Sequence, residues 1–177
     1  MSRKASKPIQ FSNSVKIDKT GDQMTIKGPK GELTVEMKEG IEVKIENNQI
    51  YVDRKDESQG PFQGLVWSLI NNAVIGVTQG FSRTLQVVGK GWRSGVNGNV
   101  INLQVGYSHP MDYKLPEGVT VTQKNPGEFT LHCHDKQLLG QVCANIKAIR
   151  PVEPYKLKGI RIEGQFLRQK VRKAAGV

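Results

Sequence analysis

The sequence contains few of the residues that build disulfides, metal centres or aromatic binding surfaces. Two cysteines and three histidines occur among its 177 residues, and aromatic side chains make up 6%. Cys133 and Cys143 form neither a CxxC pair nor a disulfide framework, which indicates a reducing compartment. With so few aromatic rings, any binding of nucleic acid must depend more on charge and backbone shape than on a large stacking platform.

Long apolar segments are also missing. The N-terminal sequence MSRKASKPIQ lacks the apolar stretch of a secretory signal, and the uncharged segment 58–82 is interrupted by polar residues. The interrupting residues are Gln63, Ser68, Asn71 and Asn72. We therefore predict a cytoplasmic protein without a membrane-spanning segment.

Positive charge is concentrated near the C-terminal end. The 26 Lys and Arg residues exceed the 16 Asp and Glu residues, which gives a formal net charge of +10. Residues 1–80 carry +1 of this charge, residues 81–146 carry +2 and residues 147–177 carry +7. Clustered cations displace condensed counterions from phosphates, so this distribution favours a polyanionic partner. An anionic membrane surface would attract the same residues.

Length and composition indicate a globular protein with one domain or two small ones. Hydrophobic residues make up 37% and charged residues 24%, which allows a buried core. In the first half, segments 24–27, 32–37, 41–46 and 50–53 alternate between apolar and polar residues and are separated by turn residues. These segments predict half-buried antiparallel strands.

Two segments show helical periodicity. Apolar residues at spacings of three and four predict a helix over 60–75, ended by Gly76 and Gly80. Its predicted apolar face comprises Phe62, Leu65, Val66, Leu69 and Ala73. A second helix is predicted after 129–133, and its apolar face comprises Leu139, Val142, Cys143, Ile146 and Ile149.

The order of elements occurs twice along the chain. Predicted strands at 85–88, 100–105, 119–122 and 129–133 precede the second helix, and the sequence at 39–43 matches 117–121 at an offset of 78 residues. We predict an α+β fold with two tandem, duplicated domains, each a small, mainly antiparallel sheet packed against one helix. The expected domains are 1–80, with a basic N-terminal arm, and 81–177, with a basic C-terminal extension.

The glycine-rich stretches do not predict nucleotide sites. Residues 89–95 begin like a dinucleotide fingerprint, but Ser94 replaces the third glycine and a strand follows instead of a helix, so a pyrophosphate would meet no helix N-terminus. Residues 28–31 are too short for a P-loop. We interpret both as tight turns, and Lys90, Trp92 and Arg93 on the longer loop suit a phosphate or an unstacked base.

The histidines and cysteines do not predict a metal site. If Cys133 points inward on its strand, His132 and His134 point outward, and Cys143 lies on the apolar face of the second helix. The four groups therefore diverge, whereas zinc needs them to converge.

Catalytic residues are equally hard to assemble. Ser108 and His109 are neighbours in sequence, but no GxSxG elbow occurs, and the acidic residues between 36 and 46 lie on a solvated face. An enzyme that used the loop at 89–95 would have to bind a nucleotide. We expect no enzyme activity, no cofactor, no metal and no small-molecule substrate.

The strongest constellation lies in 150–173. The prolines at its start prevent continuation of the second helix, so we predict that Lys156, Lys158 and Arg161 stand on an exposed extended loop, with Tyr155 available to stack or pack. Further basic residues follow at Arg168, Lys170, Arg172 and Lys173. Blocks of like charge are commonly interaction segments, and the alternative is a solvated basic tail.

At these residues the sequence resembles a universal ribosomal family, the sixth protein of the large subunit, in its bacterial form. The family's hallmark segment reads Pro-Glu-Pro-Tyr-Lys-Gly-Lys-Gly, followed by an aliphatic and a basic residue, and 153–161 is similar to it. Leu157 stands where the family usually has glycine, and Ile162 where it usually has an aromatic residue. We expect leucine to exclude an easy positive φ at this position, and the loop to bind RNA along a locally altered path. Other similar stretches are 27–33, 69–81, 87–93, 106–110, 135–137 and 140–142.

The resemblance implies a protein that binds large-subunit ribosomal RNA mainly through its second domain and C-terminal segment. It also implies neighbouring ribosomal proteins, and a location near the stalk base where translational GTPases act. Together with the residues above, it gives a predicted RNA-binding set: Lys156, Lys158, Gly159, Arg161, Arg168, Lys170, Arg172, Lys173, Tyr155, Lys90, Trp92, Arg93, Ser108 and His109. The alternative function is a generic double-stranded nucleic-acid-binding module outside the ribosome.

Overall fold

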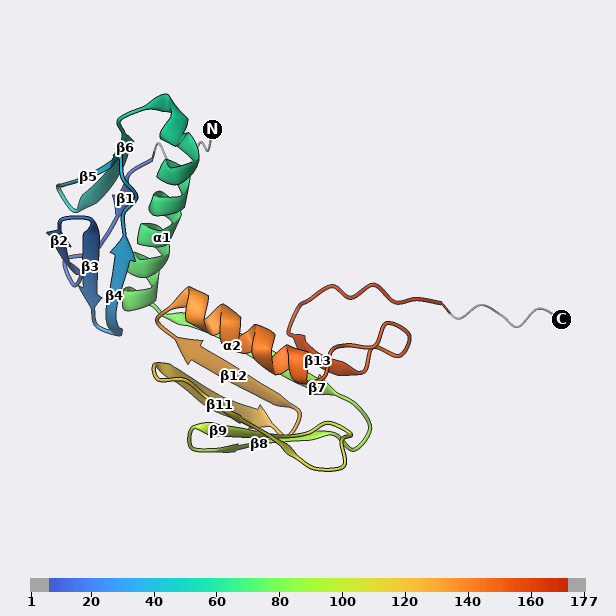
Figure 1. Ribbon diagram of the computed structural model, residues 1–177. Coiled ribbons are helices and arrows are strands. Elements are labelled where there is room, and N and C mark those ends of the chain that lie inside the picture. Colours follow the sequence, from blue (N-terminus) through green and yellow to red (C-terminus); the bar gives the residue numbers. More distant parts are fainter. Residues whose placement is uncertain (1–6, 172–177) are drawn as a thin grey trace. The chain divides into compact units, whose positions relative to one another are not determined.

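In the computed structural model, residues 7–171 are described, and they form two compact units (Figure 1). The first unit extends to Gly80 and also includes His134–Lys136. The second unit comprises Phe81–Cys133 and the chain from Gln137 onward. Each unit combines antiparallel sheets with one long helix, which confirms the predicted α+β class.

The first unit contains two three-stranded antiparallel sheets, ordered β2-β3-β4 and β1-β6-β5. The strands are β1 (Ile9–Gln10), β2 (Lys16–Thr20), β3 (Gln23–Gly28), β4 (Gly31–Glu36), β5 (Ile41–Glu46) and β6 (Gln49–Arg54). A 3₁₀ turn, η1 (Glu57–Gln59), leads into helix α1 (Gly60–Thr78). The four strands predicted here are confirmed, whereas β1 and β2 were not predicted.

The β5–β6 hairpin shows why these residues form strands. Ile41 and Val43 on β5 and Ile50 and Val52 on β6 are buried, while their neighbours face outward, as period-two alternation requires. The connecting Asn47–Asn48 pair has positive φ at both residues, 48° and 60°, which fits a two-residue type I′ turn.

Helix α1 departs from its predicted apolar face. Its buried stripe includes Val66, Ile70, Ala73 and Val77, whereas Phe62 and Leu65 are 46% and 45% exposed. The later turns are buried because the β3–β4 hairpin packs against them: a Cβ on Gly28 would lie 2.7 Å from Cγ2 of Val77.

The predicted end of α1 is also partly wrong. The helix continues to Thr78, so Gly76 lies inside it, and Gly76 is buried. Gly80 follows with φ +75°, and the N–H groups of Gln79 and Gly80 both donate to the carbonyl of Ile75. Gly80 therefore adopts the left-handed conformation that commonly ends a helix.

The second unit contains a four-stranded sheet, ordered β11-β12-β7-β13, and a three-stranded sheet, ordered β10-β9-β8. The elements are β7 (Phe81–Val88), β8 (Arg93–Asn97), β9 (Val100–Gln104), β10 (Met111–Lys114), β11 (Val119–Asn125), β12 (Glu128–Cys133), α2 (Lys136–Ile149) and β13 (Gly159–Ile162). All pairings are antiparallel. Sequence patterns did not predict β8, β10 or β13, and the tight turn predicted over 89–95 ends where β8 begins at Arg93.

Helix α2 confirms its predicted apolar face. Leu139, Val142, Cys143 and Ile146 are buried, and Ile149 packs against the same core at its edge. Figure 1 shows α2 lying along the four-stranded sheet. The core of this unit also includes Phe129 and Leu131 of β12 and Ile160 of β13, all with no exposed surface.

Candidate nucleic-acid interface

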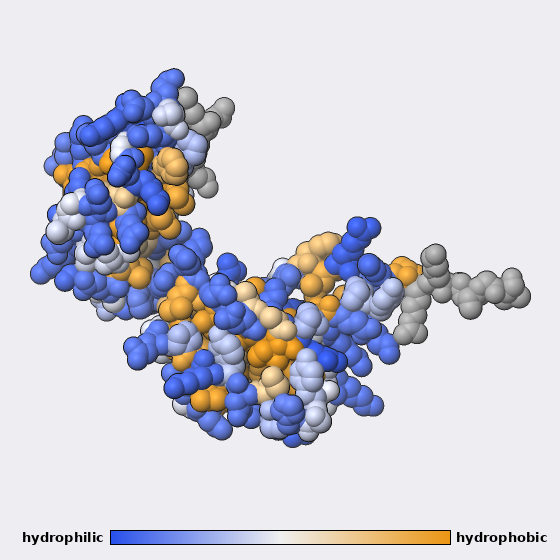
Figure 2. Space-filling model, viewed as in Figure 1, coloured by the Kyte–Doolittle hydropathy of each residue, from blue (hydrophilic) through white to orange (hydrophobic). Residues whose placement is uncertain are grey.

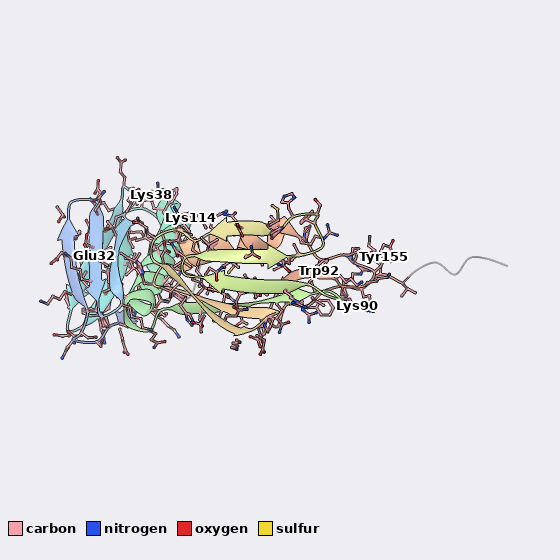
Figure 3. The ribbon with its side chains drawn as sticks, turned by 90° about the horizontal axis from the view of Figure 1, so that it is seen from below. Glu32, Lys38, Lys90, Trp92, Lys114 and Tyr155 are labelled. Atoms are coloured by element: carbon pink, nitrogen blue, oxygen red, sulfur yellow. The ribbon has the colours of Figure 1, made fainter. Side chains whose placement is uncertain are left out.

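Two of the predicted basic segments meet at one end of the second unit. Lys90 lies on the loop between β7 and β8, and Tyr155 lies on the turn that follows α2. Figure 3 shows Lys90, Trp92 and Tyr155 at the same end, while Lys114 lies toward the opposite end of this unit. Lys90, Arg93, Lys156 and Lys158 are exposed, so the structure gathers cations from distant parts of the sequence.

Residues 150–160, here called the C-terminal hairpin, are held by backbone hydrogen bonds. The N–H of Glu153 donates to the carbonyl of Lys158 at 2.8 Å, and the N–H of Leu157 donates to the carbonyl of Glu153 at 2.9 Å. At the base, the N–H of Ile160 donates to the carbonyl of Arg150 at 2.9 Å. Lys156 and Lys158 are therefore presented by a fixed turn.

The expectation that Arg161 stands on an exposed extended loop is wrong. Residues 159–162 form β13 and pair with β7, with Ile160 opposite Val87 and Arg161 opposite Gln86. Arg161 is only partly exposed, and its Nε donates to Oε1 of Gln86 at 3.2 Å. The sequence pattern concealed this strand because a single apolar pair, Ile160 and Ile162, faces the core next to a glycine and several cations.

Gly159, predicted as an RNA contact, is buried and serves a close approach within the protein. Its φ is +151°, and a Cβ added there would lie 2.5 Å from Cα of Val152. Real Cβ atoms do not approach backbone atoms so closely. Glycine is thus required for the two sides of the C-terminal hairpin to meet.

Leu157 adopts the positive φ that we expected leucine to avoid. Its φ is +57°, in the left-handed region, and its side chain is partly buried. This conformation costs an L-residue about 1–2 kcal/mol. The surrounding hydrogen bonds of the C-terminal hairpin offset that cost and hold the turn in place.

Trp92 does not offer an open ring to a base. The guanidinium carbon of Arg150 lies over its ring, 5.5 Å from the centroid, and a Cβ on Gly89 would lie 2.3 Å from Cδ2 of the indole. The ring is partly buried and packs against the core of the second unit. Any role of Trp92 in binding must therefore include its cation–π contact with Arg150.

The loop between β9 and β10 supplies the remaining predicted residues. Ser108 and His109 are both exposed, and Oγ of Ser108 lies 3.4 Å from Nδ1 of His109. Their neighbour Tyr107 donates from its hydroxyl to the carbonyl of Ile149 at 2.8 Å, at the end of α2. The structure thus connects this loop to the start of the C-terminal hairpin.

The segment beyond β13 returns to the C-terminal hairpin. The N–H of Lys170 donates to the carbonyl of Pro154 at 2.9 Å, and Nε2 of Gln169 donates to the carbonyl of Tyr155 at 3.0 Å. Arg168 and Lys170 are exposed, and Phe166 is 90% exposed. On the face shown in Figure 2, hydrophilic and hydrophobic residues lie side by side in this part of the second unit. The predicted contacts Arg172 and Lys173 lie outside the described residues.

The exposed cations of this end lack acidic partners. Within residues 7–171, Lys90, Arg93, Lys156, Lys158, Arg168 and Lys170 form no ion pair with a carboxylate. In the first unit, by contrast, Lys44 lies 3.7 Å from Asp53 and Lys55 lies 3.5 Å from Glu42. Unpaired cations on one surface raise the local positive potential, which attracts polyanions.

Sequence reasoning missed the importance of Arg150 and Tyr107. Arg150 lies over two rings, at 5.5 Å from the centroid of Trp92 and 5.1 Å from that of Tyr107. We call Trp92, Tyr107 and Arg150 the cation–π cluster. The three residues are far apart in the sequence, so no local pattern reveals the cluster. The one sequence signal is that 87–93 and 106–110, which contain the two aromatic residues, are similar to the ribosomal family.

The cysteines and histidines do not converge on a metal. No three His, Cys, Asp or Glu side chains in residues 7–171 are placed to hold an ion. Cys133 and Cys143 are both buried, as predicted, and no disulfide joins them. Burial raises the pKa of the Cys143 thiol, while the charges of Arg83 and Lys147 act in the opposite direction. Neither described helix is long and apolar enough to span a membrane.

Comparisons with known proteins cover nearly the whole chain. The model of the family "Ribosomal protein L6" matches residues 11–80 and 88–163. The chain is 46% identical over 172 residues to large ribosomal subunit protein uL6 of Saccharophagus degradans, covering 96% of this chain and 97% of the relative. It is 46% identical over 180 residues to that of Hydrogenobaculum sp., covering 99% and 98%, and 41% identical over 177 residues to that of Dictyoglomus thermophilum, covering 98% of each. The chain belongs to the ribosomal protein L6 family, and it is a structural protein of the ribosome rather than an enzyme.

Proposed function

We propose that this protein, as a constituent of the large ribosomal subunit in the cytoplasm, binds large-subunit ribosomal RNA through the basic end of its second unit. Its relatives are named as proteins of that subunit. The observation that carries the RNA contact is a fixed C-terminal hairpin whose exposed lysines, Lys156 and Lys158, lack acidic partners among the described residues.

The contacts are with phosphates and riboses. Lys156, Lys158, Arg168 and Lys170, with Arg172 and Lys173 beyond the described residues, neutralise backbone charge. Lys90, Arg93, Ser108 and His109 form a second patch on neighbouring loops. A-form RNA helices expose mainly backbone and minor groove, so such residues hold a folded RNA in place and do not read its base sequence.

We assign a different part to three members of the predicted set. Gly159 acts by permitting the C-terminal hairpin, and Arg161 acts as an edge-strand residue whose side chain is already bonded to Gln86. Tyr155, 43% exposed beside the lysines, is placed to pack against ribose or base.

The test is binding of the full chain to large-subunit ribosomal RNA fragments and to an unrelated RNA duplex across a salt series. The double variant Lys156→Gln/Lys158→Gln is compared with Lys114→Gln, an exposed lysine toward the other end of the same unit. If both lysines meet duplex phosphates, the log–log salt slope falls by about 1.8. Lys114→Gln is expected to leave the slope within about 0.3 of the wild type.

The competition between RNAs separates this function from its alternative. A preference for ribosomal RNA of at least about tenfold at matched salt supports a dedicated ribosomal contact, because non-specific binding depends on charge alone. Equal affinity for the unrelated duplex would support a generic nucleic-acid-binding module.

We further propose that the bound RNA lies near the stalk base, where translational GTPases act, among neighbouring ribosomal proteins. The support is the family's resemblance and the concentration of charge in residues 147–177. Large subunits reconstituted with Lys156→Gln/Lys158→Gln protein are expected to show slower factor-dependent GTP hydrolysis. Unchanged hydrolysis on subunits that retain the variant at full occupancy would contradict this location.

A further inference from the structure

The cation–π cluster joins three separate parts of the second unit. Trp92 lies on the loop between β7 and β8, Tyr107 lies on the loop after β9, and Arg150 follows α2. The guanidinium of Arg150 lies over both rings, at 5.5 and 5.1 Å from their centroids. Cation–π contacts of this geometry are most favourable when the cation is partly desolvated, and Arg150 and Trp92 are both partly buried.

Trp92 is fixed in this position by two glycines. A Cβ on Gly89 would lie 2.3 Å from Cδ2 of the indole, and a Cβ on Gly106 would lie 3.0 Å from its Nε1. The indole therefore fills the space between two loop backbones. Since neither loop leaves room for another side chain there, the ring presents a constant surface to Arg150.

Tyr107 anchors the same point through its hydroxyl group. It donates to the carbonyl of Ile149 at 2.8 Å, one residue before Arg150. The end of α2 is thus held through its backbone, and the next residue is held through its side chain. The ring of Tyr107 contacts Arg150 and its hydroxyl contacts Ile149, so one tyrosine holds the chain where it leaves α2.

Arg150 is also the first residue of the C-terminal hairpin. Its carbonyl accepts the N–H of Ile160 at 2.9 Å, so the arginine fixes the base of the turn that presents Lys156 and Lys158. Because Arg150 lies at this base, a shift of its guanidinium group moves Lys156 and Lys158 together. We propose that Arg150 is a positioning residue, which sets the hairpin for RNA through Trp92 and Tyr107 instead of neutralising a phosphate itself.

This inference rests on the proposed RNA-binding function and is tested by charge-conserving variants. Arg150→Lys keeps the charge but loses the planar group that stacks on both rings. We expect it to weaken binding to ribosomal RNA about tenfold, and Trp92→Leu to do the same, with Trp92→Leu/Arg150→Lys no worse than about twice either single variant. One lost phosphate contact lowers the log–log salt slope by about 0.9. We expect Arg150→Lys to lower the slope by more than this amount, although the substitution removes no charge.

A phosphate-binding arginine predicts the opposite pattern. Arg150→Lys would then bind RNA almost as well as the wild type. In the double variant, its small loss of affinity would multiply with the loss caused by Trp92→Leu. Either result overturns the positioning role. Tyr107→Phe, which keeps the ring and removes only the hydrogen bond to Ile149, is expected to weaken binding by no more than about threefold.

Two controls keep this outcome separate from other failures. Arg83→Lys, an exposed arginine on β7, is the matched substitution and should bind like the wild type. Amide NMR shifts of 156–160 in the free protein should move in Arg150→Lys, while the melting temperature stays within a few degrees. If the wild type itself fails to prefer ribosomal RNA, the proposed function is wrong. If the wild type and Lys156→Gln/Lys158→Gln behave as expected but the cluster variants bind normally, only the positioning role is wrong.

Discussion

The two units share a plan and differ at one edge of one sheet. In the first unit the order β5-β6-β1 ends with a strand of two residues, Ile9–Gln10. In the second, the corresponding order β11-β12-β7 ends with an eight-residue strand, Phe81–Val88, and β13 is added beyond it. The added strand follows the C-terminal hairpin, so one sheet extension distinguishes the basic second unit from its near-neutral counterpart.

The units also use their charges differently. The first unit, with +1 over residues 1–80, pairs lysines with acids across neighbouring strands, as in Lys27–Glu32 and Lys44–Asp53. Such exposed pairs contribute little to stability, but they cancel the local field. The second unit leaves its hairpin lysines unpaired among the described residues. The second unit therefore differs from the first in the pairing of its exposed lysines as well as in its additional strand.

The largest expected difference between the units lies in the edge strands. Ile160→Ala removes a fully buried side chain from β13 and should lower the free energy of unfolding by about 3–4 kcal/mol. Ile9→Ala on the two-residue β1 is expected to cost about 2 kcal/mol and to leave RNA affinity unchanged. Denaturant titration and RNA binding measure both effects. Equal losses of RNA affinity in the two variants would contradict the distinction.

Glycines in the two units should tolerate a methyl group differently. Gly159→Ala places Cβ against the backbone of Val152, so we expect a loss of about 2–3 kcal/mol. Gly40→Ala in the first unit meets only the flexible end of the Gln59 side chain, and should cost about 1 kcal/mol for its φ of +82°. Thermal unfolding compares them. A smaller loss at Gly159 than at Gly40 would show that the hairpin backbone adjusts easily.

Neutralising cations should affect RNA binding in the second unit alone. Lys90→Gln/Arg93→Gln removes two unpaired charges, and should lower the log–log salt slope by about 1.8 if both meet duplex phosphates. Lys44→Gln/Lys55→Gln removes two lysines that are paired with Asp53 and Glu42, and should leave the slope unchanged. Fluorescence anisotropy with labelled RNA provides both slopes. A fall caused by the first-unit pair would assign that unit an RNA contact of its own.

Left-handed residues offer a smaller contrast. Leu157→Gly should raise the free energy of unfolding by about 0.5–1 kcal/mol, because glycine adopts φ +57° without the steric cost that leucine bears. Asn48→Gly in the first unit, at φ 60°, should change it by about 0.3 kcal/mol or less, since asparagine tolerates this region. Destabilisation by Leu157→Gly would mean that the packing of the leucine side chain outweighs its backbone strain.

The smallest effect concerns pH and belongs to the unit that holds both cysteines. Burial raises the pKa of the Cys143 thiol in the folded state above its ordinary value, so the folded chain retains a proton that the unfolded chain releases at alkaline pH. The stability contributed by the neutral thiol is therefore complete below pH 9 and is lost as the pH rises toward the folded-state pKa. The difference in free energy of unfolding between the wild type and Cys143→Ala should therefore be smaller at pH 10 than at pH 7. Denaturant titration at both values tests this, and an unchanged difference would contradict the shift.

Elements with strong periodicity could be predicted from the sequence. The alternation around Ile41 and Val43 and the Asn47–Asn48 turn specify a hairpin locally, and the stripe of α2 from Leu139 to Ile149 specifies its buried face. These signals lie within short windows, where backbone geometry fixes which residues share a face. The structure agrees with them for that reason.

Features that depend on distant partners could not be predicted. β13 is a four-residue strand only because β7 offers it an edge, and the burial of Ile160 depends on residues far earlier in the sequence. Likewise, Trp92 was interpreted as a surface for bases because nothing near it in sequence reveals Arg150. The candidate cations were identifiable from composition, whereas their rigid presentation required the fold.

The pairing of β7 with β13 also affects the order of events during synthesis. β7 emerges from the exit tunnel early, but the strand that covers its edge follows only after β8 to β12 and α2 have been made. Until then, the edge of β7 is unpaired and the core lacks Ile160, which leaves an incomplete sheet that other chains could join. A nascent chain interrupted before residue 159 has neither a closed core nor a complete C-terminal hairpin. The sheet and the C-terminal hairpin are thus completed together, at the end of synthesis of the second unit.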